Sequence, residues 1–248
     1  MKPTIGIIGG GGYTAGELIR LLINHPGVEL KFIVSGSQAG KRVSSVHDDL
    51  VGETDLVFIN KPEDADVIFL CMGHGKSSGW MEENRPAMKT VVVDLSTDFR
   101  MNEDWVYGLP ELNREKTRGA TRIANPGCFA TAIQLAALPL AAAGLIERPL
   151  HINAVTGSTG AGQNPGATTH FSWRNNNVSM YKEFRHQHET EIGRSIRQVN
   201  KGVDARLHFL PVRGNFARGI YCSLYTETTA SETLLLETYN RYFEVSPF

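Results

Sequence analysis

The chain has few cysteines, almost no net charge and no long apolar run, and each of these shortages excludes a class of protein. Its 248 residues include only three cysteines, Cys71, Cys128 and Cys222. Their odd number and wide spacing argue against a disulfide framework and against a zinc cluster. The formal net charge is −1, which gives no electrostatic support for binding nucleic acid. No apolar run is long enough to predict a membrane-spanning helix.

A secretory signal peptide is not expected either, because the first predicted strand begins at Thr4. A reducing cytoplasm is the natural setting for a chain with three unpaired cysteines. The hydrophobic fraction of 41% is ordinary for a globular protein. A chain of this length can fill the core of one large domain or two modest ones.

A glycine-rich turn near the start of the chain is typical of a nucleotide-binding unit. Residues 4–8 form a short apolar run that predicts a buried parallel strand, and three leucines follow the turn at helical spacing. Between them lies the segment GGGGYTAG, residues 9–16. Glycines permit a tight turn and a close backbone approach to a pyrophosphate at a helix N-terminus. We therefore predict that a dinucleotide cofactor contacts Gly9, Gly12, Tyr13 and Thr14.

The segment after the second predicted strand, residues 28–34, lacks the acidic residue that usually binds the ribose of NAD. It reads SGSQAGKR instead, residues 35–42. Hydroxyls and basic side chains suit a 2′-phosphate, so NADP is expected in preference to NAD. The predicted contacts are Ser35, Ser37 and Lys41. A solvated loop would account for the basic residues equally well.

Further apolar runs predict an alternating α/β layer, with strands over residues 56–59, 67–71 and 91–94. Ligands of an open parallel sheet bind at the carboxyl ends of its strands. Gly73 and Gly75 are therefore expected to face the cofactor. The predicted fold class is α/β: a Rossmann-type parallel-sheet domain over residues 1–125, then an α+β catalytic domain with a mixed or antiparallel sheet over residues 126–248.

In the second half, a strand is expected over residues 152–155, and strands of an antiparallel kind are expected over residues 207–210 and 220–225. A helix is predicted through Ile192, Ile196 and Val199. Thr229 and Glu232 have the spacing of a capping box, which predicts the start of a last helix.

Cys128 lies between a Pro-Gly turn and an apolar segment that predicts a helix over residues 131–144. Backbone N–H groups at a helix start carry partial positive charge and favour the thiolate, which is the nucleophilic form. The alternative is a small buried residue at a helix start. The nucleotide-binding pattern favours the nucleophile, because a thiolate and a nicotinamide together suit the reduction of an acyl group through a thioester.

Seven ordered segments carry a family resemblance: residues 9–18, 94–100, 107–112, 125–131, 158–162, 186–192 and 214–220. They resemble the motifs of the N-acetyl-γ-glutamyl-phosphate reductase family, which belongs to the semialdehyde dehydrogenase superfamily and acts in arginine biosynthesis. The resemblance implies that NADPH reduces N-acetyl-γ-glutamyl phosphate to the semialdehyde with release of phosphate.

By the same resemblance, Cys128 is the nucleophile that forms the thioester. A histidine protonates the oxyanion, a general-acid role for which His188 is favoured and His186 is a close rival. Further cofactor contacts are implied for Ser158, Gly160 and Gly162. Arg100, Arg213 and Arg218 are candidates to bind a carboxylate or phosphate of the substrate, and Arg218 is favoured because it matches a family motif. Glu111 is a candidate at the substrate site that would orient a histidine or an arginine, although an ordinary acidic residue at a helix start explains it equally well.

The family continues past Phe248 through a helix that returns to the first domain, and a strand is expected at residues 246–248. The missing return would leave apolar sheet surface exposed. The resemblance also implies a homo-oligomer, either a dimer or a tetramer, acting on a small molecule. Two alternatives remain: a reductase of aspartyl or N-acyl-aminoadipyl phosphate, and a non-catalytic nucleotide-binding protein.

Overall fold

Two units form along the chain in the computed structural model, which describes residues 1–203 and 205–246. Unit 1 comprises Met1–Gly108 and Glu115–Asn125. Unit 2 comprises Leu109–Arg114 and Pro126–Phe248. The strand expected at residues 246–248 involves Pro247 and Phe248, which lie outside the described residues.

Unit 1 is built on a six-stranded sheet with the order β2-β1-β3-β4-β6-β5, in which every neighbouring pair is parallel. The strands are β1 (Thr4–Ile8), β2 (Glu29–Val34), β3 (Val67–Leu70), β4 (Val91–Asp94), β5 (Val106–Tyr107) and β6 (Arg122–Ala124). The helices are α1 (Tyr13–Ile23), α2 (Ser77–Asn84) and α3 (Pro110–Thr117), with 3₁₀ turns η1 (Val43–Ser45) and η2 (Asp48–Leu50). Helix α3 crosses the division between the units.

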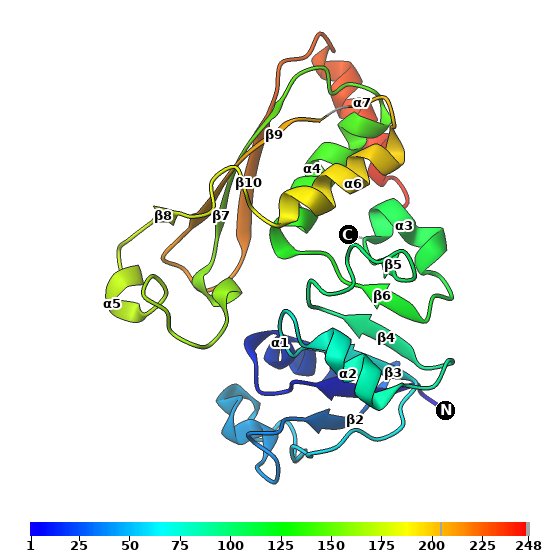
Figure 1. The fold of residues 1–248 in the computed structure, drawn as a ribbon, viewed down its shortest axis with the longest axis vertical. Coiled ribbons are helices and arrows are strands. Elements are labelled where there is room, and N and C mark those ends of the chain that lie inside the picture. Colours follow the sequence, from blue (N-terminus) through cyan, green and yellow to red (C-terminus); the bar gives the residue numbers. More distant parts are fainter. Residues whose placement is uncertain (204, 247–248) are drawn as a thin grey trace. The chain divides into compact units, whose positions relative to one another are not determined.

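Consecutive residues of β1 face opposite sides of this sheet, as the pleat requires. Ile7 packs in the cluster that contains Ile19 of α1, and Ile8 packs in the cluster that contains Trp80 of α2. Both faces are therefore buried, which explains the continuous apolar run of β1. The order of elements in Figure 1 is that of a Rossmann-type sheet, so the predicted fold class is confirmed for this half.

The strand expected over residues 56–59 is wrong. Val57 and Ile59 make only isolated bridges, to Arg42 and Val34 respectively. The run is apolar because Phe58 is 1% exposed in the core beneath α1, so burial and not strand pairing explains its composition.

Unit 2 contains a four-stranded sheet with the order β10-β7-β9-β8. Its strands are β7 (Leu150–Thr156), β8 (Ser179–Met180), β9 (Leu207–Arg213) and β10 (Ile220–Tyr225). Strands β7 and β9 are parallel, whereas the two outer pairs are antiparallel, so the sheet is mixed and not antiparallel throughout. The remaining elements are η3 (Ser158–Ala161), α4 (Cys128–Ala142), α5 (Phe171–Arg174), α6 (His188–Val199) and α7 (Glu232–Phe243).

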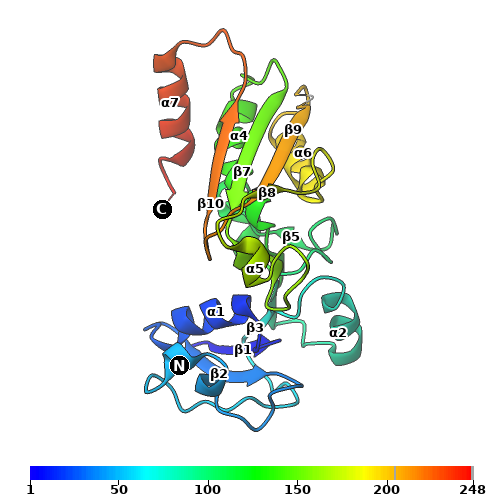
Figure 2. The same ribbon diagram turned by 90° about the vertical axis from the view of Figure 1, so that its left-hand side faces the viewer.

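Helices α4, α6 and α7 lie together on one side of this sheet in Figures 1 and 2. The core between them holds Phe129 and Ile133 of α4, Ile192 of α6 and Phe209 of β9. The apolar α4 is thus buried by its own unit, and its first turn is held in a fixed position beside α6.

Two predicted helix starts need correction. Helix α4 begins at Cys128 and not at residue 131, which makes the cysteine its first residue. The cap of α7 is Ser231, whose hydroxyl accepts a hydrogen bond from the Leu234 N–H at 3.2 Å. Thr229 donates instead to Glu147 at 3.4 Å, so the expected capping box is absent.

Candidate functional site

The glycine-rich turn of unit 1 joins β1 to α1 and leaves no room for side chains. Gly9 has φ +88°, and a Cβ there would lie 2.8 Å from the carbonyl of Cys71. A Cβ on Gly10 would lie 2.1 Å from Ile33. Only glycine permits this close packing of the turn on the carboxyl ends of the neighbouring strands.

The start of α1 presents backbone donors. Within the described part of the chain, the N–H groups of Gly11, Tyr13 and Thr14 have no hydrogen-bond partner. Gly12 is the N-cap and supplies no side-chain cap, while Tyr13 and Thr14 are exposed. Such a helix start is suited to bind an anion, and the predicted contacts Gly12, Tyr13 and Thr14 belong to it. The predicted contact Gly9 lies in the turn before it, with its N–H bonded to the Val34 carbonyl at 3.0 Å.

The residues predicted to recognise a 2′-phosphate follow β2. Ser35 is buried, with its hydroxyl 3.5 Å from the place a Gly11 Cβ would occupy, whereas Ser37 and Lys41 are exposed. Lys41 contacts the neutral amide of Gln38 at 3.0 Å, and Arg42 pairs with Asp55 at 2.9 Å. Arg42 therefore fits the solvated-loop alternative, while Lys41 has no acidic partner among the described residues.

Gly73 and Gly75 lie after β3, at the same edge of the sheet as the glycine-rich turn. Both have positive φ, +89° and +77°, and both are exposed. The Gly75 N–H donates to Asp98 at 2.7 Å, and the Ser78 N–H donates to the same carboxylate at 3.1 Å. Burial opposes ionisation of Asp98, but these backbone donors lower its pKa. Asp98 thus fixes the loop that carries both glycines.

Arg100 is also used inside unit 1. Its side chain is 4% exposed, and it donates to the carbonyls of Asn125 at 2.9 Å and Leu95 at 3.2 Å. These bonds secure the segment that leads to the cysteine turn. The guanidinium acts here as a backbone support, which does not favour the expected contact with substrate.

Cys128 begins α4 in unit 2, directly after the N-cap Gly127. Its side chain is exposed, so the alternative of a small buried residue is wrong. The other two cysteines differ, because burial raises the pKa of Cys71 to about 12 and that of Cys222 to about 11. Cys128 is the cysteine with both access and a helix N-terminus behind it.

His188 and Glu191 of α6 both contact the turn before Cys128, which is called the cysteine turn here and contains Gly127. A Cβ on Gly127 would lie 2.4 Å from His188 Nε2, so the imidazole packs directly on this backbone. Glu191 Oε2 accepts a hydrogen bond from the Gly127 N–H at 3.0 Å, and its Oε1 lies 3.9 Å from His188 Nε2. One buried carboxylate thereby holds both the cysteine turn and the histidine.

His186 is enclosed by aromatic rings. Its ring packs edge-on against Phe129, Phe209 and Tyr181, with centroid distances of 5.6, 5.4 and 5.8 Å. Its Nδ1 accepts the His188 N–H at 3.2 Å. Burial, with a smaller effect from the Lys182 charge, lowers the pKa of His186 to about 4. His186 is therefore neutral near pH 7 and supports His188.

Two further predicted segments lie together in unit 2. The Ser158 N–H donates to the Phe216 carbonyl at 2.8 Å, and a Cβ on Gly157 would clash with Ala217 at 2.4 Å. The loop with Ser158, Gly160 and Gly162 is thus hydrogen-bonded to, and packed against, the loop that contains Arg218. The side chain of Arg218 is exposed. Glu111, at the start of α3, accepts the Tyr242 hydroxyl through its carbonyl at 3.1 Å.

Sequence reasoning missed Arg174 and Tyr181 of unit 2, and it assigned no role to Glu191. Glu191 was predictable in principle, because a carboxylate three positions after His188 on a helix shares its face. Arg174 and Tyr181 belong to a polar segment without periodicity, and no local signal shows that Arg174 is buried.

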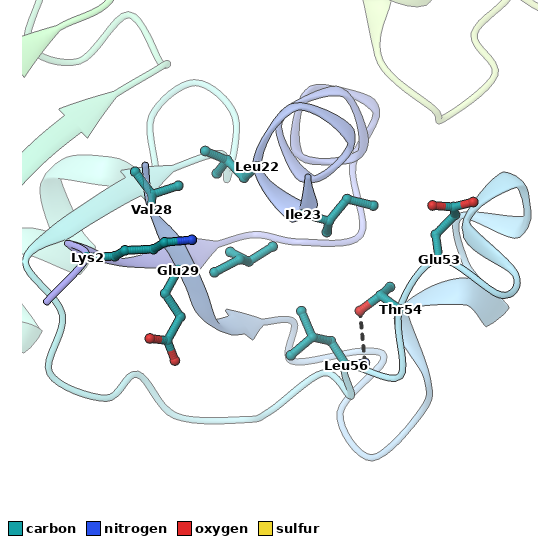
Figure 3. Close-up of a pocket in the computed structure, with 9 residues that line it drawn as sticks. Lys2, Leu22, Ile23, Val28, Glu29, Glu53, Thr54 and Leu56 are labelled. Atoms are coloured by element: carbon teal, nitrogen blue, oxygen red, sulfur yellow. Dashed lines mark hydrogen bonds between the residues drawn. The ribbon is translucent and has the colours of Figure 1, made fainter. Parts of the chain in front are cut away.

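A pocket of about 370 Å³ lies elsewhere, at the amino ends of β1 and β2 (Figure 3). Lys2, Leu22, Val28 and Leu56 are among its lining residues. It is at the opposite edge of the sheet from the glycine-rich turn, so it is not the candidate cofactor site.

Within the residues that the structure describes, no group of three or more His, Cys, Asp and Glu side chains could hold a metal ion. Among the same residues, every helix is too short or too polar to cross a membrane.

Two family models match the chain. The semialdehyde dehydrogenase NAD binding domain matches residues 4–120, and the semialdehyde dehydrogenase dimerisation domain matches residues 128–248. The N-acetyl-gamma-glutamyl-phosphate reductase of Christiangramia forsetii is 51% identical, over 98% of this chain and 77% of the relative. The enzyme of the same name from Bacteroides fragilis is 50% identical with the same coverage.

Solved structures show the same fold at low identity. Aspartate semialdehyde dehydrogenase II from Vibrio cholerae has a TM-score of 0.74 at 17% identity, over 98% of this chain and 79% of that one. Aspartate semialdehyde dehydrogenase with NADP from Candida albicans has a TM-score of 0.67 at 17% identity, over 99% and 76%.

Proposed function

Because the chain belongs to the N-acetyl-γ-glutamyl-phosphate reductase family, we propose that it reduces N-acetyl-γ-glutamyl phosphate to N-acetyl-glutamate semialdehyde and phosphate, in arginine biosynthesis. The observation that carries this proposal is the exposed Cys128 at the start of α4, with His188 packed against the preceding glycine.

Cys128 is the proposed nucleophile. Its sulfur attacks the γ-carbonyl carbon, and the C–O bond to phosphate breaks with its electron pair leaving on the phosphate, which produces a thioester. The helix N-terminus favours the thiolate before attack and again when the C–S bond breaks. Exposure of the sulfur in unit 2 allows the substrate to reach it.

His188 is the proposed acid and base. It accepts the Cys128 proton before attack, and it later protonates the oxyanion of the thiohemiacetal that precedes the aldehyde. Glu191, with Oε1 3.9 Å from His188 Nε2, fixes the orientation of that imidazole. His186 is assigned a supporting role, since it stays neutral and accepts the His188 N–H.

NADP is the proposed cofactor, and the residues of unit 1 fit it. The unpartnered N–H groups at the start of α1 suit a pyrophosphate, and Gly9 and Gly10 let the turn that presents them pack closely on the neighbouring strands. Ser35, Ser37 and Lys41 would hold a 2′-phosphate, with Gly73 and Gly75 at the same sheet edge. Ser158, Gly160 and Gly162 are the further contacts proposed from unit 2. The bound nicotinamide would supply a hydride to the thioester carbon.

A second copy of the chain is the proposed partner, which agrees with the match of residues 128–248 to a dimerisation domain. We place the contact on the sheet face of unit 2 that α4, α6 and α7 leave uncovered, where Tyr221 and Tyr225 are exposed. A reducing compartment such as the cytoplasm would suit the reaction, because Cys128 must stay a thiol.

Alkylation of the thiols tests the central claim. Iodoacetamide should label Cys128 faster than Cys71 and Cys222, since burial raises the pKa of those two. Substrate should protect Cys128. Cys128→Ser should lower NADPH oxidation by about 1,000-fold or more while nucleotide binding is retained.

Two results would contradict the proposal. One is a wild-type chain that binds NADPH and never turns over, which would favour a non-catalytic nucleotide-binding protein. The other is turnover of aspartyl phosphate alone, which would change the substrate and retain the chemistry. Cys222→Ser is the matched control and should keep full activity.

A further inference from the structure

Two arginines of unit 2 lie side by side without an acidic partner. Arg174, the last residue of α5, donates from Nη1 to the backbone carbonyl of Arg213 at 2.6 Å and from Nη2 to the Ser179 hydroxyl at 2.9 Å. In the described part of the chain, no carboxylate lies within ion-pair distance of either guanidinium.

Burial makes this pair unusual. Arg174 is 5% exposed, and charged side chains are seldom buried without a counter-charge. Burial lowers the pKa of Arg174, and the neighbouring charge of Arg213 lowers it further. The Nε atoms of both arginines are buried and have no hydrogen-bond partner. Unused buried donors on two adjacent cations are suited to bind an anion.

The position of the pair connects it to the cysteine. Arg213 stacks over the Tyr181 ring, with Cζ 4.5 Å from the centroid, and Tyr181 also contacts His186. Burial raises the pKa of Tyr181, Arg213 opposes that rise, and the negative charge of Cys128 adds to it. Tyr181 therefore lies within electrostatic reach of both the cysteine sulfur and the Arg213 guanidinium.

We propose that Arg174 and Arg213 form an anion subsite that binds an oxyanion of the substrate, either a carboxylate or the phosphate, next to Cys128. This inference rests on the proposed function, whose substrate carries both groups. Arg213 contacts the anion directly, because this residue is only half buried, whereas Arg174 is buried, and its guanidinium lies over the Tyr181 ring. Arg174 is a positioning residue, which holds the Arg213 backbone and adds positive charge.

The reverse reaction separates the two possible anions. In that direction the semialdehyde and inorganic phosphate are different molecules, so each has its own KM at saturating NADP⁺. The variants are Arg213→Gln, Arg213→Lys and Arg174→Lys. The matched control is Arg206→Gln. Arg206 is exposed and directly precedes the first residue of β9, whereas Arg213 is the last residue of that strand. Circular dichroism and the Tm of each variant report folding.

Arg213→Gln should raise one KM by about 10- to 100-fold and leave the other within about 3-fold, because a charged hydrogen bond is lost. A selective rise for the semialdehyde identifies the carboxylate, and a selective rise for phosphate identifies the phosphate. Arg213→Lys should raise the same KM by a smaller factor, since charge remains without the bidentate geometry. Arg174→Lys should raise it as well, with kcat less affected.

A binding measurement keeps this inference separate from the proposed reaction. Inorganic phosphate or N-acetylglutamate should raise the Tm of the wild-type chain, and Arg213→Gln should abolish that rise. An inactive wild-type chain that still shows this pattern would reject the reaction and keep the subsite. The subsite would be overturned if the folded Arg213 and Arg174 variants had the same two KM values as Arg206→Gln. It would also be overturned if these variants had a lower Tm but unchanged KM values, because the arginines would then be purely structural.

Discussion

His186 and His188 are two positions apart, and their surroundings give them different chemistry. His188 begins α6 with its ring on the Gly127 backbone and a carboxylate 3.9 Å away. His186 is enclosed by aromatic rings, and its pKa falls to about 4. Apolar burial disfavours a protonated imidazole, so His186 stays neutral near pH 7. The acid and base role is therefore proposed for His188 and not for His186.

The low pKa of His186 predicts an acid-sensitive fold. An unfolded histidine binds a proton near pH 6.5, while the folded one resists protonation down to about pH 4. Stability is thus fully present above pH 6.5 and is lost as the pH falls from 6.5 to 4. Urea unfolding at pH 7 and pH 4.5 should show wild type losing about 2–3 kcal/mol more than His186→Phe.

His170→Phe is the control for that measurement, because His170 is exposed in the same unit. Its pH dependence should match wild type. If His186→Phe and wild type lost the same free energy between pH 7 and pH 4.5, the folded His186 would titrate normally and the assignment of its role would fail.

Two helix starts bring the proposed reactive groups of unit 2 together. Cys128 is the first residue of α4, His188 is the first residue of α6, and Glu191 lies in the first turn of α6. The Gly127 N–H is bound by Glu191 at 3.0 Å, so a side chain of one helix occupies an open donor position of the other. The relative position of these two helices then fixes the distance between sulfur and imidazole.

Gly127→Ala tests this arrangement. The added Cβ would lie 2.4 Å from His188 Nε2, so the imidazole must move. We expect a loss of about 100-fold in kcat/KM, as misplacement of a catalytic group produces, and a fall of about 1–3 kcal/mol in the free energy of unfolding. Steady-state kinetics and urea unfolding measure the two effects.

Gly79→Ala is the matched control, because it lies in helix α2 and a Cβ there meets nothing within 4 Å. It should keep its activity and stay within about 1 kcal/mol of wild type. A Gly127→Ala variant with normal kinetics would show that His188 is free to move, which is incompatible with the packing described here.

The main elements of the fold could be predicted from local patterns, and the exceptions have physical causes. The parallel strands β1, β3 and β4 are apolar because both faces of the sheet are covered, and that pattern is visible in the sequence. The short α5 and β8 have no periodicity, and they exist through contacts such as Arg174 with the Arg213 carbonyl. Thr229 and Ser231 both precede Glu232, and only the backbone conformation decides which of them caps α7.

The residues of the candidate site also divide into those with a local sequence signal and those without one. Glycine turns and a cysteine after Pro-Gly are local signals, so the two loops and Cys128 were predictable. Arg174 was not, because its burial depends on β9, which follows it by more than thirty residues in the printed sequence. Arg100 was predicted as a substrate contact from its charge, whereas its donors serve backbone carbonyls.

At the scale of the whole molecule, the sheet of unit 2 has one covered face and one uncovered face. In the β7–β10 pair, Ile152 and Ala154 are 2% and 0% exposed beneath the helices. The residues at alternate positions of this pair belong to the uncovered face. Here Tyr221 lies opposite Val155 and Tyr225 lies opposite His151, and the two tyrosines are 70% and 62% exposed. Aromatic side chains gathered on one open sheet face are typical of a protein interface.

Tyr221→Lys therefore tests the proposed association of two copies. A lysine at the centre of β10 would place a charge inside the contact, and its desolvation should shift the wild-type oligomer toward monomer by at least about 10-fold in dissociation constant. Light scattering after size exclusion, over a range of concentrations, measures this shift. Leu21→Lys is the control, because Leu21 is also 70% exposed but belongs to α1 of unit 1, and its oligomeric state should not change. A wild-type chain that is monomeric at every concentration, or a Tyr221→Lys variant that associates like wild type, would place the partner elsewhere, since a charge in the middle of a buried aromatic contact cannot leave the association energy unchanged.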